Sequence, residues 1–212
     1  VVRHNAFIPW DDDLDISMMA EDKEKLFEIF EKEEEFVIEE VYWSDGLLLR
    51  CPRIRYKDES KNGCIDIFLW ERADNEPTGD RELWAKRQKY VQMKEQAFQK
   101  LKPSLHKTLF AGEPITDLHD KELIDKLFND IYKQQRQECQ KSGNTIYGQI
   151  DMWFEAGRWV GVYAKEDVLP FTTMKFETLD MPLPNHYDKF LTAQYGDWLA
   201  LPSKVSPKHT RF

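Results

Sequence analysis

Four aspartates lie within five residues near the start of the chain, at Asp11, Asp12, Asp13 and Asp15. If this segment is extended, Asp11, Asp13 and Asp15 project from one side of it at intervals of roughly 6.5–7 Å. Like charges at that spacing destabilise one another unless a cation neutralises them. Carboxylate oxygens are ligands that suit hard ions, so the aspartate run predicts a site for Mg²⁺ or Mn²⁺.

Another candidate carboxylate, Asp66, lies between Ile65 and Ile67 in the apolar run Gly63–Trp70. An unpaired carboxylate in a buried strand is costly. A neighbouring strand that brings Asp66 to the same metal would make it a further ligand, or would leave it as a general base. A metal that holds phosphate oxygens, beside a carboxylate that accepts the proton of an attacking hydroxyl, is the usual apparatus of phosphoryl transfer.

The aspartate run is also compatible with a solvated acidic turn or with a calcium loop. Apolar residues flank the run over Phe7–Trp10 and Leu14–Met19, which argues against a surface tail. Aspartates occupy the first, third and fifth positions of a possible calcium loop. However, the sixth position, where the loop needs Gly, is Ile16, and the twelfth is Asp22. A calcium-binding module therefore remains an alternative that fits the residues less well.

The segments around these carboxylates alternate between strand and helix patterns. Apolar alternation and short apolar runs predict strands, and spacings of three and four residues predict helices. This order predicts an α+β fold, with a small mixed sheet that carries the carboxylates and a helical insertion over about 80–141, in a single domain 1–212. We expect strands over Asp11–Ile16, Phe36–Trp43, Leu47–Cys51, Gly63–Trp70, Ile146–Phe154 and Arg158–Ala164, and helices over Glu21–Glu34, Asp80–Lys102, Lys121–Lys141 and Tyr187–Gln194.

Composition argues against several classes of protein. The net charge of -9 argues against a nucleic-acid binder, and it means that a phosphate-bearing substrate needs a local cation. No apolar run approaches the roughly 18 residues that would span a bilayer. The cysteines, Cys51, Cys64 and Cys139, show no zinc or disulfide spacing, which predicts thiols in a reducing cytoplasm. The sequence opens at Val1 without a methionine, so we expect an upstream segment.

The segment Arg3–Ile16, with Pro9-Trp10-Asp11-Asp12-Asp13-Leu14-Asp15 at its centre, resembles the signature of the LicD family. This family comprises bacterial phosphocholine transferases related to fukutin and fukutin-related protein. The resemblance continues in order and spacing to about residue 202. The later segments that carry it are Gly63–Phe68, Lys175–Glu177 with Pro182 and Pro184, and Tyr195–Trp198 with Leu201 and Pro202.

The resemblance implies a nucleotidyltransferase-like fold and a metal-dependent phosphotransferase. Such an enzyme moves phosphocholine, or a similar phospho-alditol, from a CDP-linked donor such as CDP-choline to a glycan hydroxyl. The acceptor would belong to a cell-surface polysaccharide, teichoic acid or lipooligosaccharide. The resemblance also implies a cytoplasmic protein, peripheral to the inner face of the membrane where the acceptor is lipid-linked.

The resemblance assigns a role to each candidate site residue. Asp13 and Asp15 become the paired ligands of Mg²⁺ or Mn²⁺, with Asp66 as a third ligand or a general base. Asp11 becomes an assisting catalytic carboxylate. Arg3 and Lys175 become contacts of the donor phosphates, although the residues alone fit a solvated surface equally well.

Two further functional alternatives stay open at this point. A true nucleotidyltransferase would leave the nucleotide on the product instead of releasing it. A non-catalytic partner would keep the fold and support another transferase. The family usually carries a Gly-containing segment just before the position of Val1, and its absence from this sequence gives the second alternative its weight.

Overall fold

The computed structural model describes residues 1–8, 14–44, 48–73, 80–111, 115–139, 145–148 and 162–201. Of the aspartate run it places Asp15, whereas Asp11, Asp12 and Asp13 lie outside the described residues. The expected strands Ile146–Phe154 and Arg158–Ala164 also fall partly outside them.

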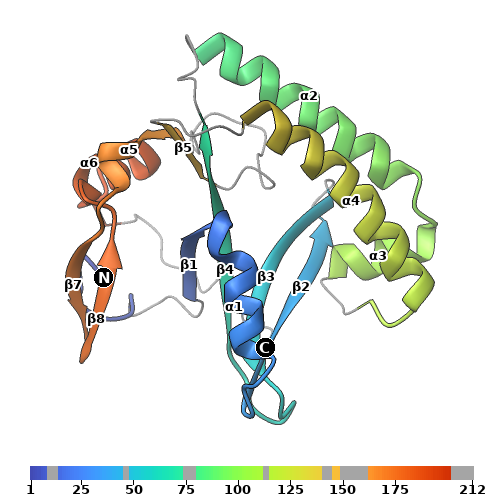
Figure 1. The fold of residues 1–212 in the computed structure, drawn as a ribbon, viewed down its shortest axis with the longest axis horizontal. Helices are drawn as coiled ribbons and strands as arrows, with labels where there is room; N and C mark the ends of the chain where they lie inside the picture. Colours follow the sequence, from blue (N-terminus) through green and yellow to red (C-terminus); the bar gives the residue numbers. More distant parts are fainter. Residues whose placement is uncertain are drawn as a thin grey trace.

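A six-stranded mixed sheet forms the centre of the fold (Figure 1). The order of its main path is β2-β3-β4-β5-β6, with antiparallel neighbours, and β1 pairs in parallel with β4. Strand β4 therefore contacts β1, β3 and β5. This sheet and the surrounding helices confirm the predicted α+β class. The strands are β1 (Leu14–Met19), β2 (Phe36–Ser44), β3 (Leu48–Tyr56), β4 (Cys64–Ala73), β5 (Thr145–Gly148) and β6 (Val162–Ala164).

Helix α1 (Lys23–Phe30) follows a 3-10 turn at Ala20–Asp22 and covers one face of the sheet. Its Leu26 packs against a core that includes Ile16 of β1 and Ile67 of β4. The helix is shorter than the predicted Glu21–Glu34. Beyond its end the chain carries consecutive glutamates, Glu33–Glu35, and negative charge is unfavourable at the C-terminus of a helix.

The predicted helical insertion forms between β4 and β5 in the sequence. It comprises α2 (Asp80–Gln99), α3 (Pro103–Ala111) and α4 (Leu118–Cys139). Pro103 opens α3 at a position where a helix does not need the missing N–H. Tyr42 of β2 joins the core of α3 and α4, and its hydroxyl donates to the Asp125 carboxylate at 2.5 Å. None of the described helices is both long and apolar enough to cross a membrane.

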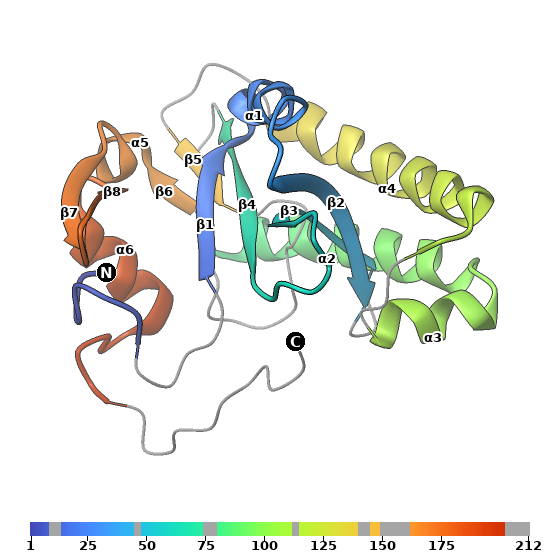
Figure 2. The ribbon, with the colours of Figure 1, turned by 90° about the horizontal axis from the view of Figure 1, so that it is seen from below.

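The C-terminal segment, residues 165–201, packs against the sheet at Met19 of β1 and Trp70 of β4. In Figures 1 and 2 it lies across the sheet from the helical insertion. Met19 and Trp70 of the sheet form a core cluster with its Val168, and Phe190 packs on that cluster. The elements of this segment are α5 (Lys165–Val168), β7 (Thr172–Phe176), β8 (Leu179–Leu183) and α6 (Tyr187–Tyr195).

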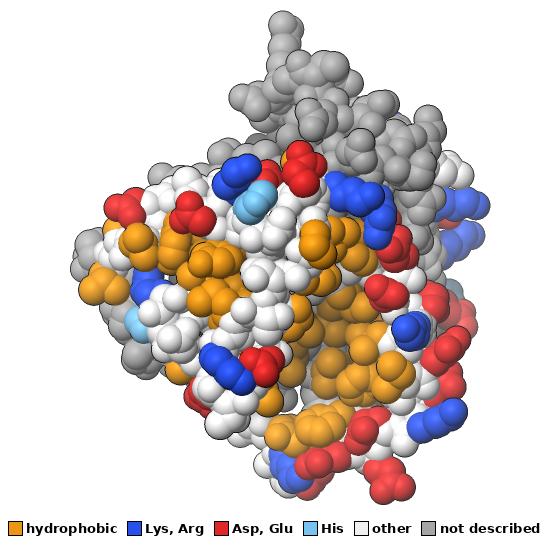
Figure 3. Space-filling view, turned by 60° about the vertical axis from the view of Figure 1, so that its left-hand side comes forward, with side chains coloured by type: hydrophobic (Ala, Val, Ile, Leu, Met, Phe, Trp, Pro, Cys, Tyr) orange, Lys and Arg blue, Asp and Glu red, His pale blue; other side chains and the backbone are white. Residues whose placement is uncertain are grey.

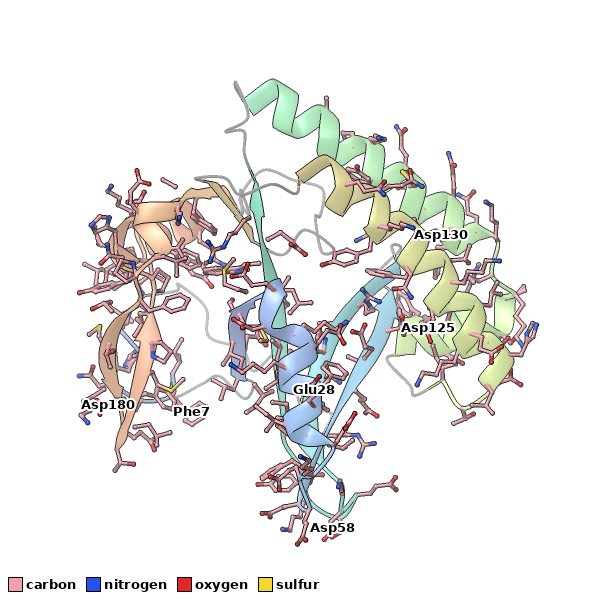
Figure 4. The ribbon with its side chains drawn as sticks, viewed as in Figure 1. Phe7, Glu28, Asp58, Asp125, Asp130 and Asp180 are labelled. Carbon is pink, nitrogen blue, oxygen red and sulfur yellow. The ribbon has the colours of Figure 1, made fainter. Side chains whose placement is uncertain are left out.

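The first residues of the chain pack on the same segment. The Glu177 N–H donates to the Asn5 carbonyl at 2.6 Å, and the Phe7 ring meets the Phe176 ring edge-on with centroids 4.9 Å apart. Figure 4 labels Phe7 beside the β7–β8 hairpin. The N-terminal residues that precede β1 are therefore anchored by residues more than 160 positions later in the chain.

Candidate active site

Asp15 and Asp66 are register partners in the parallel pairing of β1 with β4. Register partners on adjacent strands project from the same face of a sheet, and such strands lie roughly 4.7–4.9 Å apart. The structure thus brings together the two candidate carboxylates that it describes. They come from strands separated by about fifty residues of sequence.

Alternation along the strands separates this acidic face from the apolar core. Ile16 and Ile67, the neighbours of Asp15 and Asp66, are partners of each other and pack toward α1. Asp15 and Asp66, each one position earlier in its strand, must therefore project from the opposite face of the sheet. Asp15 is exposed and Asp66 is half-buried there. A shift of one residue in either strand would have placed a carboxylate in the core, which explains why this register is strongly favoured.

Arg53 of β3 holds the Asp66 carboxylate with both arms of its guanidinium. Its Nε donates to Oδ1 at 2.6 Å and its Nη2 donates to Oδ2 at 2.8 Å. The two residues are register partners across β3 and β4. The hydrogen bond to Asp66 raises the pKa of the Arg53 guanidinium above its ordinary value. A carboxylate has about four lone-pair sites, so this fork leaves capacity on both oxygens for a further ligand.

A second arginine–carboxylate fork lies next to the first. Glu39 of β2 is the register partner of Arg53, but it accepts from Arg55, with Nε to Oε1 at 2.6 Å and Nη2 to Oε2 at 3.2 Å. The hydrogen bond to Glu39 raises the pKa of Arg55. The two forks therefore use different carboxylates, Glu39 of β2 for Arg55 and Asp66 of β4 for Arg53. One face of the sheet thus carries a row of charged residues across four strands: Asp15, Asp66, Arg53 and Glu39.

The pair Asp15 and Asp66 fits a divalent cation. Both side chains offer oxygen ligands of the kind that Mg²⁺ and Mn²⁺ prefer, from rigid neighbouring strands. Asp13 is two residues before Asp15 in the sequence and lies outside the described residues, as does Asp11. Their assigned roles therefore stay predictions.

The two predicted phosphate contacts both lie on or against the C-terminal segment. Arg3 donates from Nη2 to the Ala200 carbonyl at 3.3 Å. Lys175 of β7 forms a salt bridge with Asp180 of β8, with Nζ and Oδ1 2.7 Å apart and both side chains mostly exposed. Figure 3 shows this side of the molecule hollowed, with many apolar side chains in the hollow and charged side chains around it. A phosphate that binds Lys175 would have to compete with Asp180.

A second acidic cluster occurs at the start of α4. Asp117, His119 and Asp120 place ligand atoms within 4.8 Å of one another. However, Asp117 caps the helix by accepting from the Asp120 N–H at 2.9 Å, and Asp120 pairs with Lys102 at 2.6 Å. These contacts explain the cluster as a capped helix terminus beside a salt bridge.

Arg53 is the site residue that the sequence did not predict. One signal was available, because a carboxylate inside an apolar strand requires a partner. Arg50, Arg53 and Arg55 all lie in the preceding strand, but only the register of β3 against β4 decides which of them meets Asp66.

Residues 1–115, more than half of the chain, match the family model described as "LicD/FKTN/FKRP, nucleotidyltransferase domain". The lipopolysaccharide cholinephosphotransferase LicD of Haemophilus influenzae is 24% identical over 224 aligned positions, which cover 98% of this chain and 81% of that protein. No solved structure matches the chain at a significant level. The matched range includes Asp15, Arg53 and Asp66.

Proposed function

The chain belongs to the LicD/FKTN/FKRP nucleotidyltransferase family, and on this premise we propose that it is a metal-dependent phosphotransferase. The group transferred is phosphocholine or a similar phospho-alditol, the donor is CDP-linked, and the acceptor is a glycan hydroxyl. The name of the Haemophilus relative supports choline phosphate as the first group to test. The reaction would occur in the cytoplasm, at the inner face of the membrane where the acceptor is lipid-linked.

One observation carries this proposal, namely the alignment of Asp15 with Asp66 across β1 and β4. An acidic turn on the surface would not need a second carboxylate from a distant strand beside it. Two carboxylates held side by side repel each other; the guanidinium of Arg53 lowers that repulsion, and a bound divalent cation would lower it further. The same cation could then face the phosphates of a donor. Mg²⁺ or Mn²⁺ held by Asp13, Asp15 and Asp66 would supply charge neutralisation for the phosphate oxygens.

The protein's own side chains would orient the reactants and move one proton. The acceptor hydroxyl oxygen forms a bond to the phosphorus that carries the choline, the bond from that phosphorus to CMP breaks, and CMP leaves. The hydroxyl proton passes to a carboxylate, for which Asp11 and Asp66 are the candidates. Arg3 and Lys175 would contact the donor phosphates, in exchange for their present partners Ala200 and Asp180.

A nucleotidyltransferase reaction is the second candidate, because the matching family model is described by that name. The two reactions attack different phosphorus atoms of the same donor. Choline-phosphate transfer releases CMP and adds phosphocholine to the product, whereas nucleotidyl transfer leaves CMP on the product. The mass of the product separates them.

The first experiment is a calorimetric titration of CDP-choline into the protein with Mg²⁺ or Mn²⁺, and then with a chelator. We expect binding that requires the metal and that is lost in Asp15→Asn and Asp66→Asn. Without the metal, these variants lose several kcal/mol of stabilisation of the charge on the phosphate oxygens in the transition state. The turnover of CDP-choline should therefore fall by roughly 100-fold or more. Asp130→Asn is the matched control, since Figure 4 shows this exposed carboxylate on α4, away from β1.

Full turnover in Asp15→Asn would contradict the proposed site. Absence of binding with CDP-choline and with CDP alone would favour the non-catalytic alternative. Binding of CDP without binding of CDP-choline would instead indicate a donor that carries another group.

A further inference from the structure

The fork between Arg53 and Asp66 connects a third strand to the candidate metal site. Both bonds are short and both arms of the guanidinium are used, at 2.6 and 2.8 Å. The side chains are 26% and 19% exposed, so the pair lies at the surface of the site and is not sealed in the core. Arg53 thus contacts a candidate ligand without being a ligand itself.

We propose that Arg53 is a positioning residue of the metal site, which fixes the plane of the Asp66 carboxylate so that its remaining lone pairs face the ion shared with Asp15. This inference rests on the proposed function. A carboxylate on a short side chain can still rotate about its last bond. Two parallel hydrogen bonds from a planar guanidinium stop that rotation, whereas a single hydrogen bond would not.

The pairing of the strands places Arg53 directly beside Asp66. Its register partner on β2, Glu39, is already held by Arg55, and its register partner on β4 is Asp66. Residues that hydrogen-bond to metal ligands commonly orient those ligands. The planar guanidinium of Arg can hold both oxygens of a carboxylate, whereas the ammonium group of Lys cannot form such a fork. Partly exposed ion pairs contribute little to stability, so stability alone is a poor explanation of this contact.

The test is the affinity of the whole chain for Mn²⁺, measured by electron paramagnetic resonance without any donor. Arg53→Lys keeps the positive charge and removes the fork, so we expect Mn²⁺ to bind about 10–100-fold more weakly. Arg55→Lys is the matched control, because it breaks the same kind of fork on the same strand, with Glu39 in place of Asp66. Its Mn²⁺ affinity should stay that of the unmodified chain.

Circular dichroism checks that each variant folds, and Arg53→Gln, which keeps a planar group, replaces Arg53→Lys if that variant does not fold. Unchanged Mn²⁺ affinity in the folded Arg53 variant, or an equal loss in Arg55→Lys, would overturn the positioning role. Two other outcomes would contradict the metal site of the proposed function itself. In the first, the unmodified chain binds no Mn²⁺; in the second, Asp66→Asn binds Mn²⁺ as well as the unmodified chain does.

Discussion

Asp15 and Asp66 lie side by side as like charges, so metal binding and folding stability should be linked at this pair. A ligand that binds only the folded chain stabilises it by about 2.7 kcal/mol when its concentration is 100 times its dissociation constant. We expect Mn²⁺ at that concentration to raise the free energy of unfolding by about this amount, and a chelator to reverse the rise. Chemical denaturation with and without Mn²⁺ measures it.

Variants at the pair show whether the stabilisation comes from this site. Asp66→Asn should lose most of the rise, whereas Asp130→Asn on α4 should keep all of it. An equal rise in both variants would mean that Mn²⁺ stabilises the chain elsewhere, and the cluster at Asp117, His119 and Asp120 would be the next place to test.

Residue chemistry in the sequence singled out Asp66 as a candidate, but it did not identify the partner of Asp66, Arg53. A carboxylate between two isoleucines indicated that Asp66 needs a partner, and the pairing of β1 with β4 places Asp15 beside it. The role of Arg53 depends on a pairing of only three residues between β3 and β4, which no local pattern specifies. The roles of Asp11 and Asp13 stay predictions.

At the scale of elements, Arg50 of β3 attaches the helical insertion to the sheet. Its side chain is 6% exposed and pairs with Glu40 at 2.7 Å, while its guanidinium lies 4.1 Å from the centre of the Phe128 ring. It also donates to Asn129 of α4 at 2.7 Å. One side chain therefore joins β2, β3 and α4 through ionic, ring and amide contacts.

We expect Arg50→Met to lower the free energy of unfolding by about 3 kcal/mol. Breaking one partner of a buried ion pair costs about 3–5 kcal/mol, and the lower value applies because Lys23 still pairs with Glu40. Urea denaturation measures the loss. Arg55→Met, which breaks an exposed pair, should cost less than about 1 kcal/mol. Equal losses in the two variants would show that Arg50 does not hold the insertion.

Helix and strand patterns predicted most elements but not all of their ends. The expected strands at Phe36–Trp43 and Gly63–Trp70 appear as β2 and β4, each extended by one to three residues at its C-terminal end. The pattern does not predict helix α3, because Pro103 favours a break in the chain, although proline also begins helices. For the β7–β8 hairpin, apolar residues alternate around Lys175 and the family resemblance places a late strand at Lys175–Glu177, but the prolines nearby favour turns, so no bounds for two paired strands were predicted.

At the scale of the whole molecule, the first residues of the chain contact the C-terminal segment, residues 165–201, beside the sheet that carries the candidate site. The family match covers residues 1–115, and so both carboxylate strands, while Lys175 and the C-terminal segment lie beyond it. Arg3, Asn5 and Phe7 all contact that later segment. The C-terminal segment thus fixes the start of the chain that leads into β1, although it supplies none of the paired carboxylates.

This arrangement can be tested by removing the ring contact alone. Phe7→Ala should cost about 0.5–1.5 kcal/mol beyond the area that it uncovers, because an edge-to-face aromatic pair is lost. The loss should be local. Amide exchange should become faster at residues 1–8 and at Glu177, whose N–H donates to Asn5, but not in β2 or β3. Phe110→Ala on α3, where the ring is 76% exposed, is the control.

Phe7→Ala also tests whether the anchored N-terminal residues affect the candidate metal site. Only residues 9–13 separate the anchored segment from β1, so a looser anchor should weaken the hold on the aspartates and lower the Mn²⁺ affinity. The decrease should be smaller than the roughly 10–100-fold expected when a direct partner of a ligand is changed. Faster exchange throughout the chain would indicate general destabilisation instead. Faster exchange confined to residues 1–8 and Glu177, with unchanged Mn²⁺ affinity, would show that β1 holds its carboxylate without help from the contact between Phe7 and Phe176.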